Sequence, residues 1–304
     1  MPAFKVLVPA TTANLGPGFD CLGLSLTLYN SVVVHSASRK EFSVQGEGAG
    51  VLNEDESNLV WQAACHLWRT VGYSAPALSL TMDNAIPLGR GLGSSAAAIV
   101  AGLMLANRVA GNLCPRSELV DMATELEGHP DNVAPALLGG LAVSAIADNQ
   151  VLTASFPWPH DLQVVACAPD YELSTQRARQ VLPVAVSRRD AVFNVSRVAL
   201  LLAALQAGDF TMLRQAADDR LHQPYRLALI PGADAVRERA LAAGALASVI
   251  SGAGPTLLAL VGPGQDASLV GEAMQAGFAQ EEEVDSRYWL LEPDLQGARI
   301  VDLA

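Results

Sequence analysis

The sequence predicts an α+β protein of two domains, and three observations support this prediction. The chain has 304 residues, of which 51% are hydrophobic, so it can bury a substantial core. The expected strands and helices follow one another without the strict β-α-β alternation of a doubly wound sheet. The segment Pro157-Trp158-Pro159 interrupts the apolar runs, and we place a domain boundary there, between residues 1–158 and 159–304.

The first half is predicted to contain strands and helices around a glycine-rich segment. Alternating apolar residues predict strands, and apolar residues at helical spacing, bounded by acidic residues or serine before and glycine after, predict helices. A turn-rich segment, 10–20, follows the first strand. The predicted strands cover 4–8, 22–29, 32–34, 77–82, 141–147 and 151–156, and the predicted helices cover 57–71, 94–111 and 116–127.

The second half is predicted to be richer in helices. The same patterns give four short strands and five helices, and no internal repeat is visible. The predicted strands cover 162–168, 248–251, 256–261 and 289–292, and the predicted helices cover 175–182, 187–206, 210–219, 233–243 and 267–277.

The most informative segment is 87–97, which reads P-L-G-R-G-L-G-S-S-A-A and leads into a long apolar run. Glycine allows the backbone to approach a ligand closely, and Ser94 or Ser95 can cap the helix that follows. A glycine loop at a helix N-terminus offers free N–H groups to an anion, so we expect a phosphate site. The spacing fits neither a Walker A loop nor a dinucleotide fingerprint. The glycines alone are equally compatible with a turn before a buried helix.

The charge balance limits the partners. The net charge of −12 argues against nucleic acid and against anionic membranes, since both need a basic surface. An acidic protein that binds a polyphosphate must neutralise it locally, and a divalent cation is one means of doing so. We therefore expect a metal ion beside the phosphate loop.

Cysteine usage and hydropathy indicate a cytoplasmic protein. The 4 cysteines are far apart in the sequence and form no C-x-x-C pair, as expected of reduced, buried residues. The N-terminus carries no signal-peptide pattern. The longest apolar runs, such as 198–205, are too short to span a bilayer.

Several other polar groups are candidates for chemistry, each with a structural alternative. Asn14 and Asp20 flank a glycine- and proline-containing loop, which could also be a structural turn. Glu127 lies beside Gly128 and is a better candidate for a metal ligand than Glu125, which could simply be solvated. A hydroxyl such as that of Ser95, one carboxylate and nucleotide phosphates form a typical Mg²⁺ shell.

Further candidates follow in the sequence. Asp131 and Asn132 are expected to line a pocket, with His129 shaping the turn rather than acting as an acid–base partner. Two arginines, Arg179 and Arg226, could converge on a carboxylate, although surface ion pairs are the common use of arginine. The segment 251–256, S-G-A-G-P-T, is either a tight connection or a pocket wall.

Together these motifs resemble those of the galactokinase, homoserine kinase, mevalonate kinase and phosphomevalonate kinase superfamily. The early A-T-T-A-N-L-G-P-G-F-D, the loop P-L-G-R-G-L-G-S-S-A-A and the late S-G-A-G-P-T stand in the order of the three superfamily motifs. Within it, E-G-H-P-D-N-V-A-P, S-T-Q-R-A-R and H-Q-P-Y-R-L-A-L-I-P-G are similar to homoserine kinases. The resemblance implies an N-terminal domain like the second domain of ribosomal protein S5 and a ferredoxin-like C-terminal domain, with the active site between them.

The resemblance also implies a role for each matching residue. Ser95 and Glu127 match the ligands of Mg²⁺, and Asn58 lies near the base of ATP. The phosphates would lie on Pro87, Leu88, Gly89, Arg90, Gly91, Leu92, Gly93, Ser94, Ser95, Ala96 and Ala97. The substrate would be held by Asn14, Asp20, Asp131 and Asn132 at its amino and hydroxyl ends, and by Thr175, Arg179, Arg226 and Gly252 at its carboxylate. We expect Asn14, Asp20, Asp131, Asn132 and Arg179 to matter most for catalysis.

The implied reaction is the ATP-dependent phosphorylation of the side-chain hydroxyl of L-homoserine, in threonine biosynthesis. A zwitterionic amino acid needs a carboxylate for its ammonium group, here Asp20, and arginines for its carboxylate. A dissociative transfer demands little of a general base, so none is assigned. A kinase for another small alcohol and a nucleotide-binding regulator remain as alternatives. The family leads us to expect a homodimer.

Overall fold

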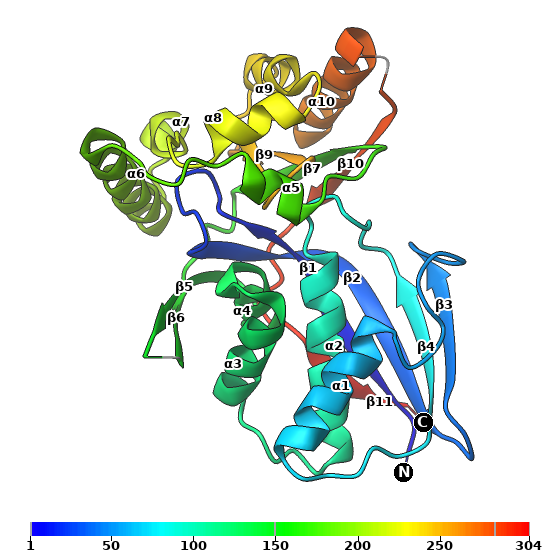
Figure 1. Cartoon of the computed structure of the whole chain (residues 1–304). Helices are drawn as coiled ribbons and strands as arrows, with labels where there is room; N and C mark the ends of the chain where they lie inside the picture. The colour runs from blue at the N-terminus through cyan, green and yellow to red at the C-terminus, as the bar shows by residue number, and fades with distance from the viewer. Residues whose placement is uncertain (1, 149, 283, 304) are drawn as a thin grey trace.

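The computed structural model describes residues 2–148, 150–282 and 284–303, and it contains two antiparallel-rich sheets with helices packed on each (Figure 1). Residue 1, where the first predicted domain begins, and residue 304, where the second ends, lie outside the described residues. The mixture of strands and helices confirms the α+β class.

The first sheet is built mainly from the first half of the chain. In the described part of the chain it has 7 strands, in the order β11-β1-β2-β4-β3, with β5 attached to β2 and β6 attached to β5. The strands are β1 (Phe4–Ala13), β2 (Leu22–Ser36), β3 (Glu41–Gly46), β4 (Leu78–Asn84), β5 (Leu141–Ala147), β6 (Gln150–Phe156) and β11 (Arg299–Asp302). Strands β3 and β4 are parallel, and the other pairs are antiparallel.

Four helices pack against this sheet (Figure 1): α1 (Leu59–Thr70), α2 (Ser94–Val109), α3 (Arg116–Glu127) and α4 (Pro130–Leu138). Helix α2 is apolar along most of its length and lies buried between α1 and β1. Its Gly102 permits close packing, because an added Cβ would lie 2.1 Å from the carbonyl oxygen of Val60 on α1. This packing holds the N-terminal end of α2 in a fixed position.

The second sheet has the ferredoxin-like order. Its strands β7 (Gln163–Pro169), β8 (Ala247–Ile250), β9 (Leu257–Val261) and β10 (Ser286–Leu291) are arranged β10-β7-β9-β8. Helices α9 (Ala233–Ala242) and α10 (Ala267–Glu282) pack on them, so the connectivity is β-α-β-β-α-β. Between β7 and α9 the chain inserts α5 (Thr175–Gln180), α6 (Arg188–Ala207), η1 (Phe210–Met212), α7 (Leu213–Ala216), α8 (Gln223–Arg226) and η2 (Leu227–Leu229).

The structure differs from the predicted elements in several places. The two strands expected over 22–34 are one continuous strand, β2. The helix expected over 210–219 is a 3₁₀ turn followed by the single-turn helix α7. Strand β3 and helix α4 were not predicted, because β3 is short and polar and α4 contains Pro130 and Pro135.

The last strand corrects the predicted extent of the second domain. Residues 159–304 were assigned to the C-terminal domain, but β11 pairs with β1 at the edge of the first sheet. The segment before it is also tied to the first sheet, because Tyr29 Oη donates to Asp294 Oδ2 at 2.7 Å. The final residues therefore belong with the N-terminal sheet.

Helix α6 corrects the expectation that no segment is long and apolar enough to cross a membrane. Its 20 residues satisfy that test by length and composition. Helices that pack on a globular domain satisfy the same test, and Asn194 on α6 is buried and hydrogen-bonded to Asp219. The apolar character of α6 is therefore weak evidence for a membrane span.

Candidate active site

The glycine loop adopts a conformation that requires its glycines. Gly91 and Gly93 both have left-handed φ, at 76° and 71°. An added Cβ on Gly91 would lie 2.4 Å from the carbonyl oxygen of Ser251, and one on Gly93 would lie 2.0 Å from Thr11 Oγ1. Side chains are therefore excluded, and the loop delivers the chain directly into the N-terminus of α2.

The helix cap differs from the prediction. Ser94 and Ser95 do not cap α2; Gly93 is the N-cap residue, and both serines lie in the first turn. The first N–H groups of a helix have no acceptor within the helix, and the helix dipole favours negative charge there. Because Ser95 does not cap the helix, its hydroxyl is available for a hydrogen bond to another side chain.

That partner is Glu127, at the end of α3. Ser95 Oγ donates a hydrogen bond to Glu127 Oε2 at 2.8 Å. Burial raises the pKa of the Glu127 carboxyl, against the lowering effect of this hydrogen bond. The structure thus joins a hydroxyl and a carboxylate beside the glycine loop, and this pair fits the oxygen ligands that Mg²⁺ takes alongside phosphates.

One cavity contains most of the residues predicted from the sequence. Every predicted substrate and metal residue lines it, as do Gly89, Arg90, Gly91, Gly93 and Ser94 of the loop. Both halves of the chain build it, because its walls include residues of β1, α2, α3, α4, α5, α8 and the turn after β8. Ala253 and Gly254 of the segment 251–256 line it too, as the pocket-wall alternative predicted. The sequence analysis missed Ala13, Leu173 and Ser174, which carry no distinctive chemistry, and it gave His129 only a role in a turn, although His129 also lines the cavity.

The remaining predicted loop residues are placed differently. Pro87, Leu92, Ala96 and Ala97 are buried, so their side chains serve the core. Asn58 caps α1 by accepting from the Val60 N–H, and with Leu88 it lines a second, more apolar hollow on the other side of the loop. The Arg90 guanidinium reaches away from the loop, donating to the Pro169 carbonyl at 2.9 Å and to Asp170 at 2.6 Å.

An ion pair joins two residues that the resemblance assigns to opposite ends of the substrate. Arg179 donates to both oxygens of Asp20, at 3.0 and 2.8 Å. This hydrogen bonding raises the pKa of Arg179. In this structure the two side chains therefore neutralise each other at the cavity wall, with Thr175 one helical turn before Arg179.

Asp131 and Asn132 lie in the first turn of helix α4, which the sequence analysis did not predict. Asp131 is 2% exposed, and His129 Nδ1 lies 2.6 Å from its Oδ1. Burial lowers the pKa of His129, but the hydrogen bond and charge of Asp131 outweigh it and the pKa is raised. Asn132 accepts a hydrogen bond from Thr11 on β1. His129 is thus a direct partner of Asp131 and not only a turn residue.

Arg226 belongs to α8, a short helix that the sequence analysis did not predict, and it is 2% exposed rather than a surface residue. It donates to the carbonyls of Ala178 and Gly252, at 3.2 and 3.1 Å. Burial, with the charge of Arg179, lowers the pKa of Arg226 to about 10. A buried guanidinium that lines a cavity is suited to an anionic group of a ligand.

Both halves of the chain are similar to known proteins. Residues 58–140 match the family model "GHMP kinases N terminal domain", and residues 201–280 match "GHMP kinases C terminal". A homoserine kinase of Desulfitobacterium hafniense is 43% identical over 98% of this chain and 99% of its own. One from Synechococcus sp. is 52% identical over 89% of each chain. The chain belongs to the homoserine kinase family.

Solved structures give the same result. The homoserine kinase of Cytophaga hutchinsonii matches with a TM-score of 0.89 at 32% identity, covering 99% of this chain and 98% of that one. A galactokinase of Lactococcus lactis matches with a TM-score of 0.72 at 15% identity, over 99% of this chain and 95% of that one, and so shares the fold. As a member of the homoserine kinase family, the chain is an ATP-dependent kinase that acts on an alcohol.

Proposed function

We propose that this protein transfers the γ-phosphoryl group of ATP to the side-chain hydroxyl of L-homoserine, forming O-phospho-L-homoserine for threonine biosynthesis. The observation that carries the proposal is the shared cavity, because the glycine loop, the Ser95–Glu127 pair and the acid- and arginine-lined pocket all meet in it. The γ-phosphate and the acceptor can therefore be brought together within one cavity.

ATP would lie across the glycine loop. The N–H groups at the start of α2 are free to receive phosphate oxygens, and the helix dipole adds to this attraction. The apolar hollow beside Asn58 and Leu88 adjoins the same loop and suits a flat purine base. In this arrangement Gly89 and Ser94 contact both halves of the nucleotide, since they line both spaces.

Magnesium would be held by Ser95 and Glu127 together with ATP oxygens. The ion supplies positive charge that offsets the charge on the transferred group. Ser95 and Glu127 would orient their oxygens toward it, and the loop amides would hold the phosphate chain in place. Positioning and charge balance account for most catalysis in phosphoryl transfer.

Homoserine would bind with its charged groups on the opposite wall. Its ammonium group would be attracted to Asp20, and its carboxylate to Arg179 and Arg226. Asp20 and Arg179 pair with each other in this structure. The homoserine zwitterion would insert between or beside them, so that the Asp20–Arg179 ion pair is replaced by two ion pairs with the ligand. The hydroxyl would then point toward Asp131, Asn132 and the γ-phosphate. We assign no general base.

The deciding experiment measures ADP release with ATP and Mg²⁺ in the presence of L-homoserine, L-serine, L-threonine, mevalonate or galactose. We expect turnover with L-homoserine and a product with the mass of O-phosphohomoserine. Turnover with another alcohol would support a different kinase of the superfamily. ATP binding without any turnover would support a nucleotide-binding regulator.

We further propose that the protein is a cytoplasmic homodimer. The exposed valines Val192 and Val195, at 62% and 72% exposure on α6, provide apolar surface that a second copy could cover. Sedimentation velocity at micromolar concentration tests this, and a species with the mass of one chain contradicts the dimer.

A further inference from the structure

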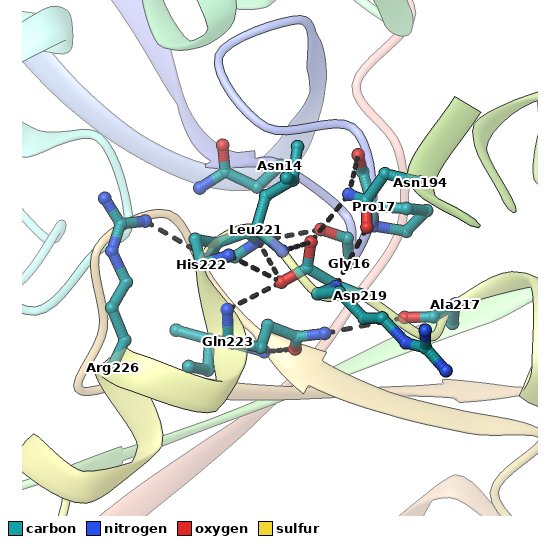
Figure 2. Close-up of polar contacts among 12 residues, drawn as sticks. Asn14, Gly16, Pro17, Asn194, Ala217, Asp219, Leu221, His222, Gln223 and Arg226 are labelled. Atoms are coloured by element: carbon teal, nitrogen blue, oxygen red, sulfur yellow. Dashed lines mark hydrogen bonds and ion pairs between the residues drawn. The ribbon is translucent and has the colours of Figure 1, made fainter. Parts of the chain in front are cut away.

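A buried polar cluster lies behind the cavity and contributes no lining residue to it. It consists of Asn194 on α6, Asp219, and His222 and Gln223 at the start of α8 (Figure 2). These side chains belong to residues that are 3%, 9%, 0% and 3% exposed, respectively. We call it the Asp219 cluster. Nothing in the proposed reaction uses it directly, so its burial needs another explanation.

The Asp219 carboxylate is fully occupied by the protein. Its Oδ1 accepts from Asn194 Nδ2 at 2.7 Å and from the Leu221 N–H at 2.9 Å. Its Oδ2 accepts from the N–H groups of His222 and Gln223, at 2.9 and 2.6 Å. A buried carboxylate with this many donors is fixed in position, and it fixes the chain before α8 and the amide of Asn194.

Two side chains of the cluster reach the loop between Asn14 and Asp20 (Figure 2). Asn194 Nδ2 donates to the Pro17 carbonyl at 3.1 Å, and His222 Nε2 lies 2.7 Å from the Gly16 carbonyl oxygen. A carbonyl oxygen only accepts, so the hydrogen is on Nε2 and the Nδ1 atom of His222 is an acceptor. Arg226 Nη1 lies 3.3 Å from that Nδ1 and can donate to it.

The loop held in this way has an unfavourable backbone. Asn14, Leu15 and Asp20 have positive φ, at 71°, 46° and 54°. Left-handed conformations are costly for residues other than glycine, and they persist where the surroundings determine them. Packing adds to the constraint, because a Cβ on Gly16 would lie 2.3 Å from the Ala217 carbonyl oxygen. The Asp219 cluster and the loop between Asn14 and Asp20 are therefore packed and hydrogen-bonded against each other.

We propose that Asn194 and Asp219 are positioning residues for the amino-acid substrate. Through Pro17 and Gly16 they set the loop that carries Asn14 and Asp20, and through His222 they orient Arg226. One buried cluster therefore fixes both the amino end and the carboxylate end of the pocket, without touching the ligand. This inference rests on the proposed function, because it takes homoserine as the molecule that the pocket holds.

The test compares steady-state kinetics of Asn194→Ala and Asp219→Asn with the parent. We expect KM for L-homoserine to rise about five- to tenfold, as for loss of one buried hydrogen bond, while KM for ATP stays within about twofold. Asp218→Asn is the matched control, since Asp218 is the adjacent, exposed aspartate, and it should leave both constants unchanged. Asn194→Ala keeps the three backbone N–H donors to Asp219, so this variant is expected to fold. It therefore tests the positioning role even if Asp219→Asn does not fold.

A double-mutant cycle distinguishes positioning from simple stabilisation. If Asn194 acts by placing Asp20, its effect on KM for homoserine should largely disappear in an Asp20→Asn background, because the side chain to be placed has lost its charge. Additive effects, or equal rises in KM for homoserine and ATP, overturn the inference. A parent that fails to phosphorylate homoserine overturns the proposed function and this inference with it; an active parent with unaltered variants overturns only the inference.

Discussion

Arg179 pairs with Asp20 through two hydrogen bonds, one to each carboxylate oxygen, and this geometry requires a guanidinium. Arginine can bind both oxygens of a carboxylate at once, whereas lysine presents a single charge. We therefore predict that Arg179→Lys raises KM for L-homoserine about tenfold and changes KM for ATP little, measured by coupled ADP assay. Arg177→Lys, on the exposed side of the same helix, is the control. An unchanged KM for homoserine would remove Arg179 from the pocket.

The Ser95–Glu127 pair predicts how the enzyme depends on magnesium. Ser95→Ala and Glu127→Ala should each lower kcat/KM at limiting Mg²⁺ at least about tenfold, with partial recovery at high Mg²⁺, because one oxygen ligand is lost. Glu125→Ala is the control, since this exposed glutamate lies two residues earlier on α3. Variants that transfer phosphate at the parent rate at every Mg²⁺ concentration would contradict the metal assignment.

The His129–Asp131 contact predicts a pH-dependent contribution to stability. The pKa of His129 is raised in the folded protein, so its contribution is fully present below the ordinary histidine pKa and is lost as pH rises through the folded value. The Tm of the parent should therefore exceed that of His129→Gln by more at pH 5.5 than at pH 9, measured in EDTA. An equal difference at both pH values would show that the imidazolium is not the stabilising form.

At the scale of elements, the C-terminal segment depends on one buried carboxylate. Asp294 accepts from Tyr29 and Arg299 with one oxygen, and from the N–H groups of Gln296 and Gly297 with the other. Burial alone would raise the pKa of Asp294, but these donors together lower it. The carboxylate therefore stabilises the fold above the ordinary aspartate pKa, and this stabilisation is lost as pH falls through the lowered value.

We predict that Asp294→Asn lowers the free energy of unfolding at pH 7 by about 1–3 kcal/mol, because a buried acceptor set is broken. The difference from the parent should shrink toward pH 3, measured by urea denaturation. Asp302→Asn is the control, because Asp302 forms an exposed ion pair with Arg108 and such pairs contribute little. If the loss in free energy of unfolding is the same at every pH, the effect of Asp294→Asn comes from altered packing and not from the lost carboxylate charge.

Helices with regular apolar spacing could be predicted from the sequence, and those shaped by distant contacts could not. The helix expected over 116–127 is α3, because its pattern and its end at Gly128 are local. Helix α4 was missed because its two prolines read as loop, although Pro130 occupies the first turn, where no N–H is needed. Capping of α2 was misassigned because Gly93 is fixed by its contact with Thr11, which no local pattern reveals.

The candidate site shows the same division. Residues with distinctive chemistry in recognisable motifs, such as Asn14, Glu127 and Asp131, could be predicted to share a pocket, and all three line it. The pairing of Asp20 with Arg179 could not, because it joins positions 159 residues apart. The Asp219 cluster was missed as well, since its role depends on carbonyl groups of another segment.

At the scale of the whole molecule, the two sheets share a core on one face of the second sheet, and a separate apolar cluster that includes Val165, Val236 and Val270 lies between that sheet and helices α9 and α10. A continuous cluster of buried apolar residues includes Val6 of β1, Ala97 of α2, and Val164 and Leu258 of the second sheet. The glycine loop crosses the same boundary, since its Gly89 carbonyl accepts from the Leu173 N–H and its Gly91 carbonyl from Ser251 Oγ. The glycine loop and the opposite wall of the cavity are therefore joined by hydrogen bonds as well as by the shared core.

This shared core predicts cooperative unfolding. Circular dichroism and tryptophan fluorescence should report the same urea midpoint, because Trp61 and Trp68 lie in the first half of the chain and Trp289 in the second. ATP with Mg²⁺ should raise that midpoint for both signals. Two separated transitions would show that the halves unfold independently and that the core does not couple them.

The position of β11 has a consequence for how the protein is made. The first and last strands of the described residues are neighbours, with Phe4 opposite Asp302 (Figure 1). During synthesis on the ribosome, β1 emerges long before β11, and the edge of β1 that pairs with β11 stays unpaired until β11 has emerged. A chain that stops before residue 299 would leave that edge exposed to other nascent chains.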